Sequence, residues 1–355
     1  MCNRLEYRGN IYKMRRQDRN IVAFYPYSLC QTSYIYTMQG FLESKYKVID
    51  YFDLLNGVYD LWEFRSIYLN WPENMVKDKD IRLIKKAKCY GVKIVWVYHN
   101  KIPHDSDITD MVTRNTSFLI KISDVIIIHS RQSVEILKQF EPKLKYEKVR
   151  FLAHPEFVGD YFGYAQPDKT ARNKDRFLFA FYSLIRPYKN IEILINAFNR
   201  LNKSYDCGLV IAGYSPSEEY FSSLKEIAQN NDGITLCSQY INSLEMAAYL
   251  EQADILVLPY SYKSAMNSGT MIMAFSYKRT VIVPDICMAN DYDDSLIYKY
   301  TYGDEENHIQ ELHKKMEMAY KDGKERCREK GEKLYNIVTQ DNAKNKVKEE
   351  LISIV

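Results

Sequence analysis

The chain has 355 residues, with 49 Lys and Arg against 46 Asp and Glu, so its formal net charge is +3. A balance this close to neutral argues against nucleic-acid binding through an overall positive field. A hydrophobic content of 46% excludes an intrinsically disordered chain, and the length predicts two domains that each bury their own core.

Seven cysteines are scattered along the chain without Cys-x-x-Cys spacing. With no secretory apolar segment, this pattern is typical of reduced thiols in a cytoplasmic protein. The apolar runs are strand-sized, well short of the roughly 20 residues that a membrane-spanning helix needs. We therefore expect a cytoplasmic protein.

The first half of the chain predicts one doubly wound domain. Residues 1–20 are basic and lack periodicity, which is typical of a loosely attached arm. Over residues 21–165, continuous apolar runs alternate with helical patterns, as in parallel sheets covered by helices on both faces. The runs lie at 21–25, 65–69, 92–98 and 125–128.

The second half repeats this pattern after a polar stretch at 166–175, which we expect to be the linker. Residues 176–333 predict a second Rossmann-like domain, and residues 334–355 form a charged tail with sparse apolar positions. The apolar runs of this half lie at 177–181, 209–211, 255–258 and 281–283. The predicted fold class is therefore α/β, with two doubly wound domains that face a cleft. Ligands of such sheets bind beyond the carboxyl ends of the strands.

A cationic turn follows the first strand of the second domain, at residues 183–190. It supplies Arg186, which can bind two phosphate oxygens at once, and Lys189, which acts as a point charge. Pro187 is expected near the first position of the following helix. The alternative is a solvated surface turn without a ligand.

A second anion-binding signature is Ser268-Gly269-Thr270, which follows the run at 255–258 and opens a helix. Free backbone N–H groups and the helix dipole favour negative charge there. Gly269 would let a phosphate approach the backbone closely, although a plain N-cap is the alternative. A site built from both turns would hold a diphosphate, which indicates a nucleotide-activated substrate.

Four segments of this half resemble the donor-binding domain of GT-B glycosyltransferases, and they are 185–189, 210–213, 253–260 and 268–269. The resemblance is closest to bacterial family 4 enzymes that build cell-surface polysaccharides. It implies a GT-B fold, a UDP- or GDP-linked sugar donor, and an oligosaccharide or lipid-linked acceptor. It also implies that Arg186 and Lys189 contact the donor diphosphate, and that the tail at 334–355 crosses back to the first domain.

The chain departs from the family 4 pattern at two positions. That pattern has two glutamates eight residues apart around the second turn, where this chain has Ala265 and Met273. Neither side chain can accept a hydrogen bond from a ribose or sugar hydroxyl. The identity of the nucleotide and sugar, and the retaining or inverting outcome, therefore stay open.

The first domain offers candidates for the acceptor side. His99 follows a predicted strand and could take a proton from an acceptor hydroxyl, with Glu73 and Asp105 as further candidate bases. Trp71 could stack on a sugar ring, and His104 is a second possible sugar or acceptor contact. The alternative is structural in each case, such as a Trp buried under a loop or a turn capped by His.

We expect no metal cofactor. The pairs Asp78/Asp80 and Asp105/Asp107 mimic an Asp-x-Asp motif but do not end a matching strand, and no Cys/His cluster exists. Two cations and a helix N-terminus can stabilise a departing diphosphate without Mg²⁺. The basic residues of segment 82–88 could also contact an anionic membrane surface, which predicts a peripheral location; a solvated helix face is the alternative.

The sequence thus predicts a metal-independent hexosyltransferase that uses a nucleoside-diphosphate sugar in surface polysaccharide synthesis. A nucleotide-sugar epimerase on the same scaffold would differ in needing no acceptor. A non-catalytic nucleotide-sugar-binding or scaffold protein is the third hypothesis, motivated by Ala265 and Met273.

Overall fold

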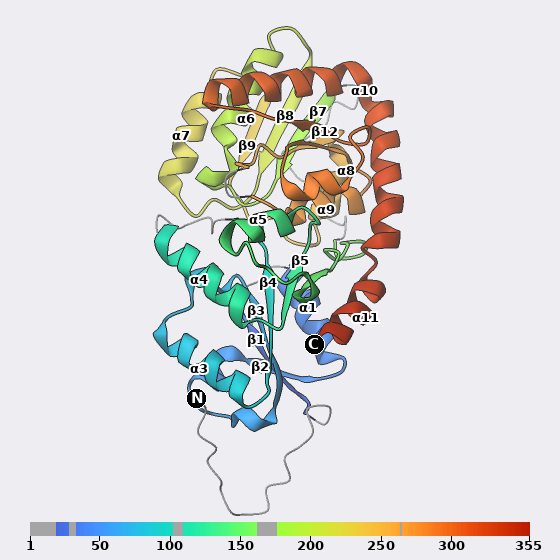
Figure 1. Ribbon diagram of the computed structural model, residues 1–355. Coiled ribbons are helices and arrows are strands. Elements are labelled where there is room, and N and C mark those ends of the chain that lie inside the picture. The colour runs from blue at the N-terminus through green and yellow to red at the C-terminus, as the bar shows by residue number, and fades with distance from the viewer. Residues whose placement is uncertain (1–18, 28–32, 102–108, 162–175, 263–264) are drawn as a thin grey trace, which may run out of the picture. The chain divides into compact units, whose positions relative to one another are not determined.

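The computed structural model describes residues 19–27, 33–101, 109–161, 176–262 and 265–355 (Figure 1). The chain forms two compact units, one of Met1–Ala153 with Lys344–Val355 and one of His154–Ala343. The arm predicted at 1–20 and the linker predicted at 166–175 lie almost wholly outside the described residues.

The first unit is built on a six-stranded sheet in which every neighbouring pair is parallel. The strand order is β2-β1-β3-β4-β5-β6, with bounds β1 (Ile21–Tyr25), β2 (Lys47–Asp50), β3 (Phe64–Asn70), β4 (Lys93–Tyr98), β5 (Val125–Ile128) and β6 (Val149–Phe151). The central strands are buried on both faces; β4, for example, is buried from Ile94 to Tyr98.

Helices cover both faces of this sheet. They are α1 (Ser33–Glu43), α2 (Tyr51–Leu55), α3 (Asp78–Cys89), α4 (Thr109–Ile122), α5 (Ser133–Phe140) and α11 (Lys344–Ile354). On one face, alternate strand residues such as Phe24 and Val97 pack with Met38 of α1 and with Val347 and Leu351 of α11. The last helix of the chain therefore completes the core of the first unit.

The second unit has its own parallel six-stranded sheet in the order β12-β11-β10-β7-β8-β9. The bounds are β7 (Phe177–Tyr182), β8 (Cys207–Ala212), β9 (Ile234–Cys237), β10 (Ile255–Val257), β11 (Val281–Pro284) and β12 (Tyr298–Tyr300). Its helices are α6 (Ile191–Leu201), α7 (Glu218–Ala228), α8 (Met246–Gln252), α9 (Gly269–Ser276) and α10 (Glu305–Asp341).

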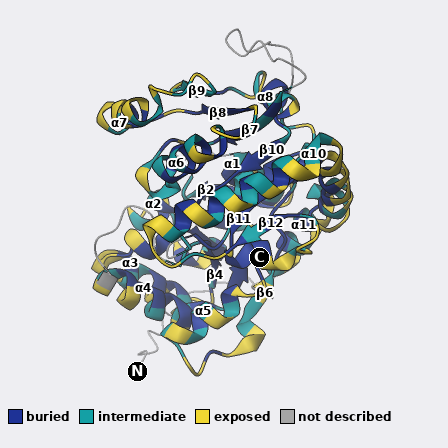
Figure 2. Ribbon diagram, turned by 90° about the horizontal axis from the view of Figure 1, so that it is seen from above, coloured by how far each residue is buried: buried dark blue, intermediate teal, exposed yellow. Residues whose placement is uncertain are grey.

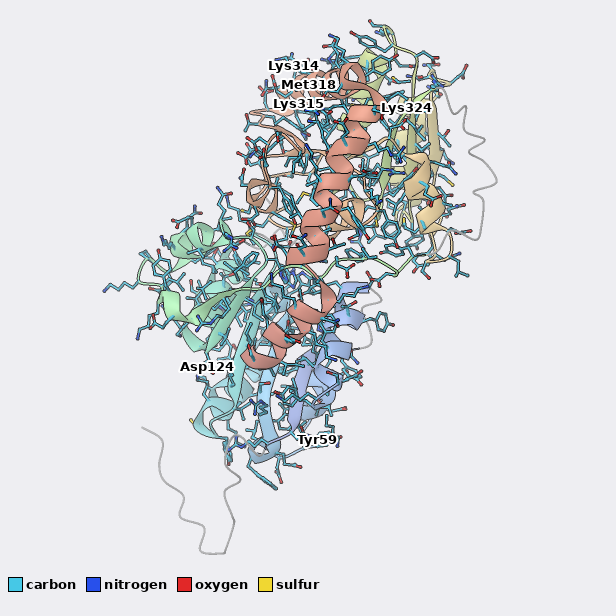
Figure 3. The ribbon with its side chains drawn as sticks, turned by 90° about the vertical axis from the view of Figure 1, so that its right-hand side faces the viewer. Tyr59, Asp124, Lys314, Lys315, Met318 and Lys324 are labelled. Atoms are coloured by element: carbon cyan, nitrogen blue, oxygen red, sulfur yellow. The ribbon has the colours of Figure 1, made fainter. Side chains whose placement is uncertain are left out.

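Helix α10 is long and changes direction within its length (Figure 1). The change occurs at Gly323, whose φ of 78° and ψ of 173° are not helical and suit a residue without a Cβ. Before this point Leu312 and Met316 pack into the core, whereas Lys314 and Met318 lie on the outer side of the helix (Figure 3).

In both units the strands are mostly buried and the outer sides of the helices are exposed (Figure 2). Two parallel sheets with flanking helices confirm the predicted α/β class with two doubly wound units. Among the described residues, no helix combines the length and apolar character needed to cross a membrane.

Candidate functional site

The cationic turn of the second unit lies between β7 and α6. Pro187–Lys189 forms a single 3-10 turn, and Asn190 then adopts a left-handed conformation with φ 54° and ψ 46°. Asparagine tolerates this region better than most residues. Helix α6 begins only at Ile191, so Pro187 opens the 3-10 turn and not the helix itself, which corrects the predicted position of Pro187.

Two contacts tie this turn to the segment that follows β10. Asn190 donates from Nδ2 to the carbonyl oxygen of Pro259 over 2.9 Å. The Nζ of Lys189 lies 4.2 Å from the centre of the Tyr260 ring, a cation–π contact. Within the described part of the chain no carboxylate pairs with Lys189. Its charge is therefore held by an aromatic face and is not neutralised by an acid among these residues.

The second turn is the start of α9. Ser268 caps this helix, because its Oγ accepts from the backbone N of Met271 over 3.1 Å. The Ser268 hydroxyl also donates to the Tyr260 hydroxyl over 3.2 Å, and the Thr270 hydroxyl donates to that of Ser183 over 3.4 Å. The N-cap role that was the alternative reading is thus present. The same contacts also join the α9 start to the cationic turn.

A close backbone approach fixes the start of the cationic turn. A Cβ added to Gly213, just after β8, would lie 1.8 Å from the carbonyl oxygen of Ser183. Two residues further on, the N–H of Ile185 donates to the carbonyl oxygen of Tyr214 over 3.0 Å. The turn that carries Arg186 and Lys189 therefore rests on the segment after β8, and only glycine fits at position 213 without displacing it.

His154 lies beside the start of α9. A Cβ added to Gly269 would be 3.4 Å from its Nε2. The ring is buried and donates from Nδ1 to the carbonyl oxygen of Pro155 over 2.8 Å, while Asn342 donates to the carbonyl oxygen of His154 over 2.7 Å. His154 was not among the predicted site residues, and the structure places it against the predicted phosphate-binding backbone.

The two positions that depart from the family 4 pattern are both part of the apolar core of the second unit. Ala265 and Met273 are buried and pack with the core cluster around β7, β10 and α9. Neither offers a hydrogen-bond acceptor of the carboxylate type to a ligand.

In the first unit, His99 lies directly after β4 and is buried. Its Nε2 lies 3.2 Å from Oδ1 of Asn70, the last residue of β3. Asn70 in turn donates from Nδ2 to the carbonyl oxygen of Tyr25 at the end of β1. The Asn70 side chain therefore links the carboxyl ends of three neighbouring strands, β1, β3 and β4.

Aromatic rings surround the His99 imidazole. The Trp71 ring stacks on it, with centroids 4.5 Å apart and an interplanar angle of 30°, and the Tyr34 ring meets it edge-on at 5.1 Å. Trp71 has φ 46° and ψ 42°, a left-handed conformation that is strained for a bulky residue and that clusters at functional sites. One face of the Trp71 ring is thus covered by the His99 ring.

The His129 ring contacts both Tyr34 and His99, with ring centroids 5.4 and 5.1 Å apart. The Tyr34 hydroxyl donates to its Nε2 over 2.9 Å, while its Nδ1 donates to the carbonyl oxygen of Leu152 over 2.7 Å. Burial lowers the pKa of His129 to about 4, so the ring is neutral at physiological pH. This histidine is a fixed structural acceptor for Tyr34.

Glu73 is not brought together with His99. Its side chain is buried, and Oε1 accepts from the indole Nε1 of Trp96 over 3.0 Å. Trp96 lies in β4 on the face opposite to Val95 and Val97, because side chains alternate along a strand. Burial raises the pKa of Glu73 to about 7. This geometry favours a structural role for Glu73 over the predicted role of acceptor base.

The remaining candidates divide between described and undescribed residues. His104 and Asp105 lie outside the described residues, as does Asp107. Asp80 is buried, accepts from the Tyr51 hydroxyl over 2.9 Å and from the backbone N of Lys77, and so caps α3. Among the described residues no group of three or more His, Cys, Asp or Glu side chains is arranged to hold a metal ion.

A comparison with family models matches residues 165–334 to the family described as glycosyl transferases group 1. Among curated proteins, the chain is 24% identical over 236 residues to a GDP-mannose:glycolipid 4-beta-D-mannosyltransferase from Xanthomonas campestris pv. campestris. The alignment covers 63% of this chain and 62% of the relative, so the chain matches somewhat less than two thirds of the relative's length.

Solved structures share the fold at low sequence identity. Anabaena Alr3699/HepE in complex with UDP-glucose has a TM-score of 0.67 at 13% identity and covers 94% of this chain and 98% of its own. Sucrose-phosphate synthase from Thermosynechococcus elongatus has a TM-score of 0.65 at 14% identity, with coverage of 81% and 72%. TarM has a TM-score of 0.59 at 17% identity, with coverage of 81% and 54%.

Proposed function

We propose that this chain, a glycosyltransferase of the GT-B fold whose residues 165–334 match group 1, transfers a hexose from a nucleoside-diphosphate sugar to an acceptor hydroxyl. The acceptor would be an oligosaccharide or a lipid-linked saccharide in surface polysaccharide synthesis. One observation carries the proposal: the cationic turn and the start of α9 meet within one unit through the Ser183–Thr270 contact, and the Asn190–Pro259 bond ties the same turn to the segment after β10.

In this proposal the two turns bind the donor diphosphate. Arg186 and Lys189 supply positive charge, and the N–H groups of Gly269 and Thr270, which precede the capped N–H of Met271, supply backbone donors. As the sugar leaves, negative charge grows on the diphosphate, and preorganised donors stabilise that charge without reorganising. This arrangement supports transfer without a metal ion.

The class of nucleotide is taken from the comparisons and stays a proposal for this chain. The curated relative is named for GDP-mannose and a glycolipid acceptor, and one of the similar structures holds UDP-glucose. A UDP- or GDP-linked donor and a glycoconjugate acceptor are therefore the partners to test first.

On the acceptor side, His99 is the residue we propose to take the proton of the acceptor hydroxyl. It is buried, held by Asn70 and flanked by aromatic rings that suit a sugar. Trp71, His104 and Asp105 stay as further predicted contacts or bases. Glu73 is the weakest candidate, because its carboxyl group is engaged by Trp96.

A peripheral position on an anionic membrane surface, at its cytoplasmic side, is supported by charge alone. Helix α3 exposes Lys79, Arg82, Lys85 and Lys86, while its apolar residues Ile84 and Ala87 are buried within the first unit. Lipid contact through α3 would therefore be mainly electrostatic and sensitive to salt, since Ile81 and Leu83 are half-buried as well. Sedimentation with vesicles of phosphatidylglycerol, compared with phosphatidylcholine, would test it.

A non-catalytic nucleotide-sugar-binding protein is the second candidate. The buried apolar Ala265 and Met273 favour it, because these positions give a bound sugar no carboxylate. It predicts nucleotide-sugar binding without turnover in the presence of acceptor.

The deciding experiment is thermal stabilisation by UDP, GDP, CMP, dTDP and their sugars, with and without Mg²⁺. A ligand at about 100 times its Kd should stabilise the fold by roughly 2.7 kcal/mol. We expect a selective shift without Mg²⁺ that Arg186→Ala abolishes. Arg200→Ala is the matched control, because Arg200 lies on α6 in a surface ion pair with Glu306. No shift with any nucleotide would refute the donor site.

A further inference from the structure

The orientation of the Asn70 amide is determined by its surroundings. Asn70 ends β3, which lies between β1 and β4 in the sheet, and its side chain has no exposed surface. It donates from Nδ2 to the carbonyl oxygen of Tyr25 over 3.0 Å. A carbonyl oxygen can only accept, so the amide nitrogen must face Tyr25 and the amide oxygen must face β4.

This orientation dictates the protonation of His99. The Asn70 Oδ1 lies 3.2 Å from Nε2 of His99, and an amide oxygen can only accept. Nε2 must therefore carry a proton, so Nδ1 is the acceptor atom whenever the ring is neutral. The stacked Trp71 ring and the edge-on Tyr34 ring hold the plane of the imidazole.

We infer that Asn70 is a positioning residue that holds His99 in the Nε2–H tautomer and so presents Nδ1 to the acceptor hydroxyl. The inference rests on the proposed function of His99. In that step the acceptor oxygen bonds to the anomeric carbon and its proton passes to Nδ1. The bond from that carbon to the diphosphate oxygen breaks, and its electron pair leaves on the diphosphate.

Two other buried histidines have the opposite tautomer to that inferred for His99. His129 donates from Nδ1 to the carbonyl oxygen of Leu152, and His154 donates from Nδ1 to that of Pro155. Both are therefore Nδ1–H tautomers, opposite to His99. Among the described residues, Tyr34 from α1 and His129 after β5 are titratable groups whose rings contact His99.

The first test is nitrogen NMR of the full chain labelled with ¹⁵N-histidine, without substrate. The chain has six histidines, and His99→Gln identifies the signals of His99 by their loss. We expect a protonated Nε2 and an unprotonated Nδ1 for His99, and the reverse for His129 and His154. A protonated Nδ1 on His99 overturns the inference whether or not transferase activity has been found.

The second test compares Asn70→Asp with Asn70→Leu in acceptor-dependent transfer. Asp keeps an oxygen acceptor for Nε2–H, whereas Leu fills a similar volume without one, and both variants lose the N–H that bonds to the Tyr25 carbonyl oxygen. We expect Asn70→Leu to lower kcat roughly tenfold to hundredfold through misplacement of His99, and Asn70→Asp to retain more of it. A role in packing alone predicts the reverse order, because Leu is the better filler of a buried site. That reverse order overturns the inference.

Donor binding by thermal shift serves as the control for both variants, since the donor residues belong to the second unit. Unchanged donor binding with reduced kcat is the expected pattern. Should Asn70→Leu fail to fold, the spectrum of the unaltered chain still decides the tautomer. Full activity in His99→Gln would refute the proposed role of His99, and a spectrum as expected would leave the assignment of Asn70 intact.

Discussion

Thr270, the second residue of α9, donates through its hydroxyl to the hydroxyl of Ser183 over 3.4 Å. These residues are 87 positions apart and belong to the two turns that the sequence predicts as anion-binding. The bond is long, and both side chains are half-buried, so its contribution to the stability of the fold is small. The Thr270 hydroxyl is therefore available to change partners when a phosphate binds.

Thr270→Val removes this hydroxyl while keeping the shape of the side chain, and Thr270→Ser keeps the hydroxyl. A neutral hydrogen bond contributes about 0.5–1.5 kcal/mol net, so Thr270→Val should raise the Kd for the nucleotide by roughly two- to twelvefold. Thr270→Ser should bind almost as the unaltered chain does. Isothermal titration calorimetry measures both, and equal affinities in the two variants would show that the hydroxyl does not contact the ligand.

Gly213→Ala should displace the cationic turn, because the new Cβ would lie 1.8 Å from the Ser183 carbonyl oxygen. Overpacking against backbone costs about 1–3 kcal/mol, and nucleotide binding should weaken with it. Gly40→Ala in α1 is the control, since nothing lies within 4 Å of its added Cβ. That change should be neutral or stabilise by about 0.5–1 kcal/mol. Calorimetric unfolding curves compare the two, and a Gly213→Ala chain as stable as Gly40→Ala would contradict the close approach.

The apolar runs of the sequence predicted the inner strands of both sheets. The four strands that were not predicted all lie at sheet edges. They are β2 and β6 at the edges of the first sheet, and β12 and β9 at the edges of the second. Edge strands here are only three or four residues long, and β6 and β9 contain no buried residue. A strand paired on one side does not need a continuous apolar run, so its signal in the sequence is weak.

The sequence predicted site residues only where the side chain itself is charged or can cap a helix. Arg186, Lys189 and Ser268 follow strands and carry charge or capping groups, and the structure brings their turns together. The roles of Asn190, Gly213 and Asn70 arise from partners far away in the sequence, such as Pro259, 69 residues after Asn190. Such pairings depend on strand order, which a local pattern does not contain. Glu73 shows the converse case, since the local pattern gives no sign that its carboxyl group accepts a hydrogen bond from Trp96.

Lys189→Met tests whether the charge above Tyr260 binds a phosphate. A charge-assisted hydrogen bond contributes about 1.5–3 kcal/mol, so the Kd for the nucleotide should rise roughly tenfold or more, and Lys189→Arg should recover part of the loss. Lys225→Met is a matched control, because Lys225 also lies over an aromatic ring, that of Phe221, at 4.9 Å. Equal binding in the two Met variants would show that Lys189 only packs against Tyr260.

Glu73→Gln should change how stability depends on pH. Burial raises the pKa of Glu73 from 4.5 to about 7, so between these values the folded chain binds more protons at this site than the unfolded chain does. Stability from this group is therefore full below about pH 4.5 and falls as the pH rises toward 7. The shift corresponds to about 3 kcal/mol in order of magnitude.

Gln has no charge to bury and keeps an oxygen that can accept from Trp96, so the variant should lack this fall and gain stability relative to the unaltered chain above pH 7. Urea unfolding midpoints at pH 5 and pH 8 measure the difference. Glu135→Gln, at an exposed position on α5 paired with Lys138, should leave the pH dependence unchanged. Parallel pH profiles for Glu73→Gln and the unaltered chain would show that the carboxyl group is charged at both values. Loss of transfer in a stably folded Glu73→Gln would return Glu73 to the candidate bases.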